Sequence, residues 1–91
     1  MRPPGEPRVE MLKALAHPVR LRLVETVATR RLRVGELAAL FPVDRTTISK
    51  HIAVLREAGI IDDEREGREI YYRLRMPCLN DFLRCLGEMS D

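Results

Sequence analysis

The chain has 91 residues, of which 45% are hydrophobic, so it fits one domain with a small core. A formal net charge of +2 excludes a polycation, and any affinity for a negatively charged partner must come from where the 16 lysines and arginines lie. No apolar run is long enough to span a bilayer, and the first residues lack the apolar centre of a signal peptide, so we expect a cytoplasmic protein without membrane contact.

Prolines mark the start of the chain. Three of the six prolines and one glycine fall within residues 1–7, which predicts a flexible N-terminal arm. The remaining residues, 8–91, are expected to form one domain. A domain of this size has little interior, so it gains stability from a partner chain.

The first part of the domain is predicted to be helical. Val9, Leu12 and Leu15 recur at helical spacing, which indicates a helix over about residues 8–16. Pro18 then begins a second helix, because proline is favoured at the first helical position.

A pair of helices joined by a tight turn follows an extended link over residues 32–34. The first helix of the pair, over residues 34–41, has an apolar inner face that includes Leu37. Pro42 ends this helix, and the carboxylate of Asp44 is placed to cap the next one. This order is typical of a helix-turn-helix.

The second helix of the pair is apolar on one side only. Ile48, Ile52 and Leu55 recur at i, i+4 and i+7 and are predicted to point inward. Short hydroxyls and cations lie on or near the outer face, and such side chains suit base edges and phosphates. These candidate DNA-binding residues are Arg45, Thr46, Thr47, Ser49, Lys50 and His51. The alternative is a solvated surface helix without a nucleic-acid partner.

A charged hairpin is predicted after this helix. Gly59 occupies the position where a left-handed residue ends a helix, and β-branched residues then begin a strand. Residues 62–69 are highly charged and contain a turn glycine, and residues 70–74 form a second strand. A hairpin directly after a recognition helix is the wing of a winged helix. Arg65 and Arg68, near its tip, are candidates for contacts with phosphates or a narrow minor groove.

The last predicted helix begins after Pro77, runs to about Met89 and contains both cysteines. Cys78 and Cys85 are seven residues apart, which places both thiols on one side of the helix about 10 Å apart along its axis. They cannot form a disulfide with each other inside this helix. The same broad face carries the apolar residues Leu79, Phe82, Leu86 and Met89.

The sequence leaves two explanations for these cysteines. Free cysteines often pack as small hydrophobic residues and need no further chemistry. Alternatively, thiolates bind soft ions such as Cu(I), Zn(II), Cd(II) or trivalent arsenic, or they oxidise, which makes Cys78 and Cys85 a candidate inducer site. Two thiolates are too few for a zinc site, so a metal would require further donors such as Asp81, Glu88 or a second chain.

Four segments in order resemble the ArsR/SmtB-type repressors. They are LKALAHPVRLRLV from Leu12 to Val24, VGELA from Val34, TISKHIAVLREAGI from Thr47 to Ile60, and EGREIYYRL from Glu66 to Leu74. The resemblance covers nearly the whole chain. It implies a mainly α fold with a small β-hairpin (α+β), namely a dimeric winged helix-turn-helix. It also implies a sequence-specific transcriptional repressor that leaves its operator when an inducer, often a soft metal ion, binds.

The resemblance further implies that the first and last helices form the interface of a homodimer. The residues expected there are Leu12, Leu79, Phe82, Leu86 and Met89. If the two last helices cross antiparallel, Cys78 of one chain faces Cys85 of the other, and two thiol pairs arise by symmetry.

The chain departs from the known sensor patterns of this family. The segment from Val34 to Ala38 lacks the cysteine motif of arsenic and cadmium sensors. The chain has only two histidines, His17 and His51, so the Asp and His set of zinc sensors on the last helix is missing. The resemblance therefore supports DNA binding far better than any named inducer, and both a soft metal at the cysteines and no cofactor at all stay open.

An enzymatic function is not expected. No serine or cysteine has a histidine and a carboxylate in a suitable pattern, and there is no glycine-rich phosphate loop. The remaining alternative to a regulator that binds double-stranded DNA is a winged helix used for protein contact. A salt-dependent shift with duplex DNA distinguishes the two.

Overall fold

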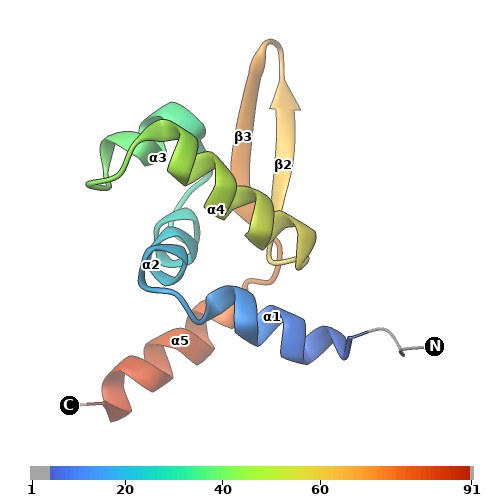
Figure 1. Ribbon diagram of the computed structural model, residues 1–91, viewed down its shortest axis with the longest axis vertical. Coiled ribbons are helices and arrows are strands. Elements are labelled where there is room, and N and C mark those ends of the chain that lie inside the picture. Colours follow the sequence, from blue (N-terminus) through green and yellow to red (C-terminus); the bar gives the residue numbers. More distant parts are fainter. Residues whose placement is uncertain (1–4, 91) are drawn as a thin grey trace.

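A computed structural model describes residues 5–90 of the chain. Helices form most of it, and a small antiparallel sheet lies beside them with its hairpin projecting from one end (Figure 1). The elements in chain order are α1 (Pro7–Leu15), α2 (Pro18–Val27), β1 (Leu32–Arg33), α3 (Val34–Ala39), α4 (Arg45–Glu57), β2 (Ile61–Glu66), β3 (Glu69–Leu74) and α5 (Cys78–Met89). The predicted class, a mainly α winged helix-turn-helix, is confirmed.

The first helix begins slightly earlier than the sequence indicated. Residues 1–4 of the predicted arm lie outside the described residues, and Pro7, at the end of that arm, already starts α1. Glu6 caps this helix, because its carboxylate accepts a hydrogen bond from the backbone N–H of Arg8 at 3.2 Å.

The wing contains one more strand partner than predicted. The strands are ordered β1-β3-β2, and all pairs are antiparallel. The segment expected to be a plain extended link pairs with the hairpin, with Leu32 opposite Tyr72. The hairpin turn has Gly67 at φ +64°, a conformation that favours glycine. Strand β1 therefore ties the base of the wing to the helical body.

The core fixes the orientation of α4. The inner residues Ile48 and Leu55 are fully buried and Ile52 is nearly so, as the helical spacing predicted. They pack in one cluster with residues of the other four helices and of the sheet. Gly59 has φ +80° and ends this segment as predicted, so the chain turns directly into β2.

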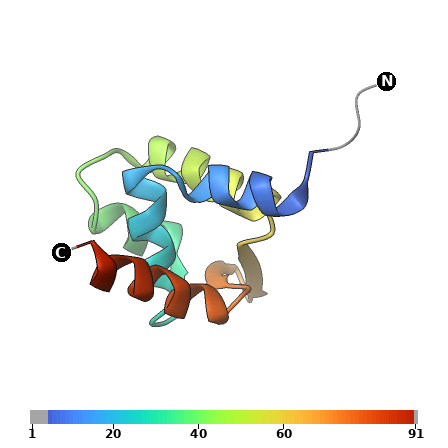
Figure 2. The ribbon, with the colours of Figure 1, turned by 90° about the horizontal axis from the view of Figure 1, so that it is seen from below.

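Helices α1 and α5 lie at the end of the molecule opposite the wing (Figure 1), and the view from below shows both on that surface (Figure 2). Within α5, Leu79 and Leu83 are buried in the core of their own chain. This corrects the expectation that Leu79 lies on the dimer-forming surface. The other four residues expected there, Leu12, Phe82, Leu86 and Met89, are exposed. Among residues 5–90, no helix has the length and hydropathy needed to cross a membrane.

Candidate nucleic-acid interface

The start of α4 is anchored by its cap. The carboxylate of Asp44 accepts a hydrogen bond from the backbone N–H of Thr47 at 2.7 Å. This bond stabilises the charged carboxylate and lowers the pKa of Asp44. The cap predicted from the sequence is therefore present, and it fixes the first turn of the helix that carries the candidate DNA-binding residues.

The first half of α4 presents polar side chains to solvent. Arg45, Thr46, Ser49 and Lys50 are exposed, and Thr47 is half-buried. Within residues 5–90, neither Arg45 nor Lys50 has an ion-pair partner. These cations can therefore bind a ligand without first giving up an internal contact.

His51 is placed differently from these exposed residues. It is half-buried, its ring centre lies 4.5 Å from that of His17, and its Nδ1 lies 3.3 Å from Nη1 of Arg20. Burial, followed by the neighbouring His17 and Arg20, lowers the pKa of His51. Arg20 also donates from Nε to the carbonyl oxygen of Ala14 at 2.6 Å. His51 thus joins α4 to α2 and to the end of α1, a packing role that its position in the sequence did not indicate.

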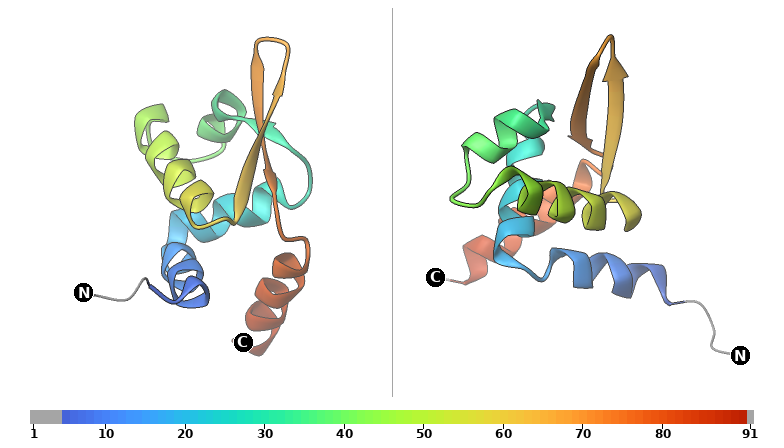
Figure 3. Two further views of the ribbon diagram at one scale, coloured as in Figure 1. Left: turned by 90° about the vertical axis from the view of Figure 1, so that its right-hand side faces the viewer. Right: turned by 45° about the horizontal axis from the view of Figure 1, so that its top comes forward.

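The wing carries the two arginines predicted to contact DNA. Strands β2 and β3 project beyond the helices (Figure 3), and Arg65 and Arg68 are exposed near the tip. In the described part of the chain, no carboxylate lies within ion-pair distance of either guanidinium.

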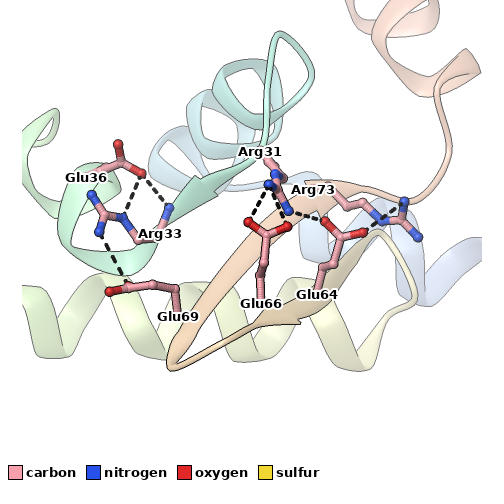
Figure 4. A network of polar contacts seen from close by, with 7 residues as sticks. All are labelled: Arg31, Arg33, Glu36, Glu64, Glu66, Glu69 and Arg73. Carbon is pink, nitrogen blue, oxygen red and sulfur yellow. Dashed lines mark hydrogen bonds and ion pairs between the residues drawn. The ribbon is translucent and has the colours of Figure 1, made fainter.

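Two acidic residues of the wing are held by Arg31, which comes from the segment between α2 and β1 (Figure 4). Its Nη1 donates to Glu64, and its Nη2 lies 3.1 Å from Glu66. Its guanidinium carbon also lies 4.2 Å from the ring centre of Tyr71, a cation–π contact. The hydrogen bonds to Glu64 and then Glu66 raise the pKa of Arg31.

A second arginine makes a parallel connection. Nε of Arg33 lies 3.3 Å from Glu36 and its Nη1 lies 3.4 Å from Glu69 on the wing (Figure 4). The backbone N–H of Arg33 also donates to Glu36 at 2.9 Å, and this bond is the main cause that lowers the pKa of Glu36. Arg73 pairs with Glu64 from within the sheet, at 3.9 Å.

Sequence reasoning missed these arginines. It recognised that the wing is rich in charge, but Arg31 and Glu64 are separated by 33 residues, and no local pattern joins them. The sequence offered one signal for these contacts, namely two arginines, Arg31 and Arg33, in the extended segment that comes before the acidic hairpin. Such a signal becomes specific only when β1 is known to pair with β3.

The two cysteines lie at the other end of the molecule. Cys78 and Cys85 are free and exposed on α5. Within residues 5–90, no three His, Cys, Asp or Glu side chains gather closely enough to hold a metal ion. The donors of one chain therefore do not fit a resident metal, since two thiols supply too few ligands.

Known proteins share this arrangement. A family model described as a helix-turn-helix domain matches residues 15–64, which include α2, α3, α4 and the start of β2. The biofilm growth-associated repressor of Agrobacterium fabrum is 50% identical over 64 residues, which are 70% of this chain and 55% of that protein. The chain thus spans about half the length of the curated relative it matches.

Solved structures agree along most of the chain. The transcriptional repressor BigR from Xylella fastidiosa is 35% identical, with a TM-score of 0.80, and the match covers 91% of this chain and 85% of that one. The homodimeric winged helix-turn-helix DNA-binding domain of Mb0332 from Mycobacterium bovis is 25% identical, with a TM-score of 0.83, over 93% and 79%. The fold and its exposed helix thus define a winged helix-turn-helix domain. The chain belongs to the ArsR/SmtB family of transcriptional repressors.

Proposed function

We propose that this protein is a sequence-specific DNA-binding repressor that acts in the cytoplasm as a homodimer. The observation that carries the proposal is the exposed first half of α4, where Arg45 and Lys50 have no internal partner within residues 5–90 while the opposite side of the helix is buried. In a helix-turn-helix protein the second helix enters the major groove with its first residues on the base edges. The residues assigned to contacts with the bases and the adjoining backbone are Arg45, Thr46, Thr47, Ser49 and Lys50.

The wing supplies contacts that do not depend on sequence. Arg65 and Arg68 are exposed at its tip, where they can reach phosphates beside the helix in the major groove. His51 contributes by holding α4 against α2 rather than by contacting bases. The specificity of the protein therefore resides in α4, and the wing adds affinity.

Dimerisation follows from the apolar surface at the other end. Val9 and Leu12 on α1 and Phe82, Leu86 and Met89 on α5 are exposed, and Met89 retains 80% of its accessible surface. Exposed apolar side chains gathered on these two helices fit contact with a second copy of the chain. A symmetric dimer would place its two α4 helices about one DNA turn, ~34 Å, apart.

The experiment that tests DNA binding is footprinting on the promoter region beside the protein's own gene. We expect protection of two half-sites about one helical turn apart, and affinity that falls steeply with salt. A winged helix used for protein contact would give no protection at any salt concentration. That result would refute the proposed function.

The dimer is tested by light scattering at micromolar concentration. We expect the mass of two chains for the parent and a shift toward one chain for Phe82→Glu, which places a charge on the exposed face of α5. A parent mass of one chain would refute the proposal.

The inducer is proposed to act on the cysteines of two chains together. Cys78 and Cys85 share the exposed face of α5 with Phe82, so a dimer formed through this helix brings thiols of both chains near each other. A soft metal ion or metalloid bound there, or oxidation of two thiols to a disulfide by a peroxide that is reduced to water, would shift α5 and lower operator affinity. A coupling of about 1–3 kcal/mol is sufficient.

A double Cys78→Ser, Cys85→Ser variant separates sensing from packing. We expect it to bind operator DNA like the parent but to remain bound when zinc, arsenite or hydrogen peroxide releases the parent. If the variant and the parent respond identically, the thiols serve only in packing.

A further inference from the structure

A groove of about 630 Å³ lies between the wing and the start of the helix-turn-helix. Arg33 lines it at the end of β1, Arg45 at the first residue of α4, and Arg68 at the wing turn. Arginines from three separate elements thus converge on one open space. Two of these elements, α4 and the wing, are those proposed above to contact DNA.

The charges in this groove do not cancel. Glu36 and Glu69 also line it, and both contact Arg33, at 3.3 and 3.4 Å. Within residues 5–90, Arg45 and Arg68 pair with no carboxylate. Three guanidinium groups therefore face two carboxylates, and the excess positive charge belongs to the two arginines without partners.

The rest of the lining is apolar and indicates the kind of ligand. Val34, Ala39 and Ile70 contribute carbon surface beside the arginines. A guanidinium group matches a phosphate through two parallel hydrogen bonds. A deoxyribose needs carbon surface next to that phosphate, whereas a free phosphate ion does not.

We propose that this groove binds one sugar–phosphate strand of the DNA, and that Arg33 is a phosphate-binding residue together with Arg45 and Arg68. This inference rests on the proposed function. The groove would add affinity on any sequence, since a phosphate carries no sequence information. Arg33 would exchange its contact with Glu69 for one with the phosphate and keep its contact with Glu36.

Gly35 offers a test that does not disturb the fold. It lines the groove in the first turn of α3, it is exposed, and a Cβ at this position would meet no atom within 4 Å. A side chain is therefore accommodated, and an acidic one is favoured near a helix N-terminus. Gly35→Glu adds a negative charge to the groove, Gly35→Gln is its neutral match, and Gly35→Lys adds a positive charge.

The measurement is the affinity of each full-length variant for a short random-sequence duplex at several salt concentrations. At low salt we expect Gly35→Glu to bind about fivefold more weakly than Gly35→Gln, the effect of one unit charge at contact distance in water. Gly35→Lys should bind more tightly than Gly35→Gln. Arg33→Gln should lower the slope of log affinity against log salt by about 0.9, the value for one phosphate contact.

Arg22→Gln is the matched control, because Arg22 is exposed on α2 outside the groove. It should keep the parent's salt slope. If the parent binds the duplex and the three Gly35 variants bind equally well, the groove proposal is wrong while the proposed function stands. If the parent binds no duplex at any salt concentration, both fail.

Inorganic phosphate distinguishes a DNA strand from a small anion. We add inorganic phosphate at millimolar concentration to the parent and to Arg33→Gln. We expect phosphate to change the melting temperature of the parent no more than that of the variant. A rise in the parent that Arg33→Gln abolishes would show a site for a free anion and would overturn the proposal.

Discussion

The recognition helix and the wing reach the same side of the molecule with opposite charge. The first half of α4 contains Arg45 and Lys50 and no acidic residue. The two wing strands contain five acidic residues and only two arginines apart from the one at the turn. The helix is suited to DNA by its own composition, whereas the wing by itself would repel a phosphate backbone.

Arginines from outside the hairpin neutralise part of the acidic charge of the wing. Arg31 and Arg33 come from outside the hairpin and contact Glu64, Glu66 and Glu69. Their contacts offset carboxylate charge and hold the hairpin against the body of the protein. An acidic wing can then present its tip arginines to DNA, provided that Arg31 keeps its contacts with Glu64 and Glu66.

Replacing the unpaired cations of α4 should have the largest effect. We expect Arg45→Ala or Lys50→Ala to weaken operator binding by about 1–3 kcal/mol where the side chain contacts a base. Gel-shift titration at moderate salt measures this change, with Arg22→Ala as the control. Parent-like binding by both variants would show that α4 is not the recognition helix.

The wing arginines should affect affinity without affecting sequence choice. Arg65→Ala and Arg68→Ala are each expected to reduce the salt slope by about 1, on operator and random DNA alike. The ratio of the two affinities should stay unchanged. A change in that ratio would show that the wing contacts bases, and it would contradict the proposal that specificity resides in α4 alone.

The arginine at the base of the wing should act without contacting DNA. In Arg31→Gln, Glu66 loses its arginine and Glu64 keeps only the pair with Arg73, so we expect weaker DNA binding and faster amide exchange in β2. The ion pairs are well exposed, so the loss of folding stability should stay below about 1 kcal/mol. Adding Glu64→Gln and Glu66→Gln should restore DNA affinity, which would not happen if Arg31 itself bound phosphate.

Lowering the pH should weaken the contact of α4 with α2, whereas raising the salt concentration should weaken the ion pairs that hold the wing. The pKa of His51 is lowered in the folded protein by burial, so the neutral form is favoured. Its contribution to stability is present above the ordinary histidine pKa of about 6.5 and is lost as pH falls below it. The melting temperature should therefore fall between about pH 7.5 and 5.5, and less so in His51→Gln. Equal slopes for the two proteins would show that His51 does not contribute.

Local patterns predicted most of the fold and the surface of α4. The spacing of Ile48, Ile52 and Leu55 indicated which side of the helix is buried, because an α-helix completes one turn every 3.6 residues. Asp44 and Gly59 marked the ends of this segment through a cap and a left-handed residue. The exposure of Arg45, Thr46, Ser49 and Lys50 followed from the same periodicity.

Helical periodicity did not predict burial where a neighbouring element covers only part of a helix face. Leu79 and Phe82 share a broad apolar face, but only Leu79 is buried, because α5 packs on its own chain with one edge of that face. His51 lies beside the exposed residues along α4, yet α2 approaches it closely enough for contact with His17 and Arg20. The sequence does not contain the positions of neighbouring helices.

The sequence by itself determined the helices, the hairpin, the inner face of α4 and the family, because each depends on residues close together in the chain or on their order. Only the tertiary structure decided that β1 joins the sheet, that Arg31 and Arg33 hold the acidic wing, and that three arginines line one groove. These features join residues more than 30 positions apart, as Arg31 and Glu64 show. Their interaction depends on distance in space, which the fold sets and local spacing does not.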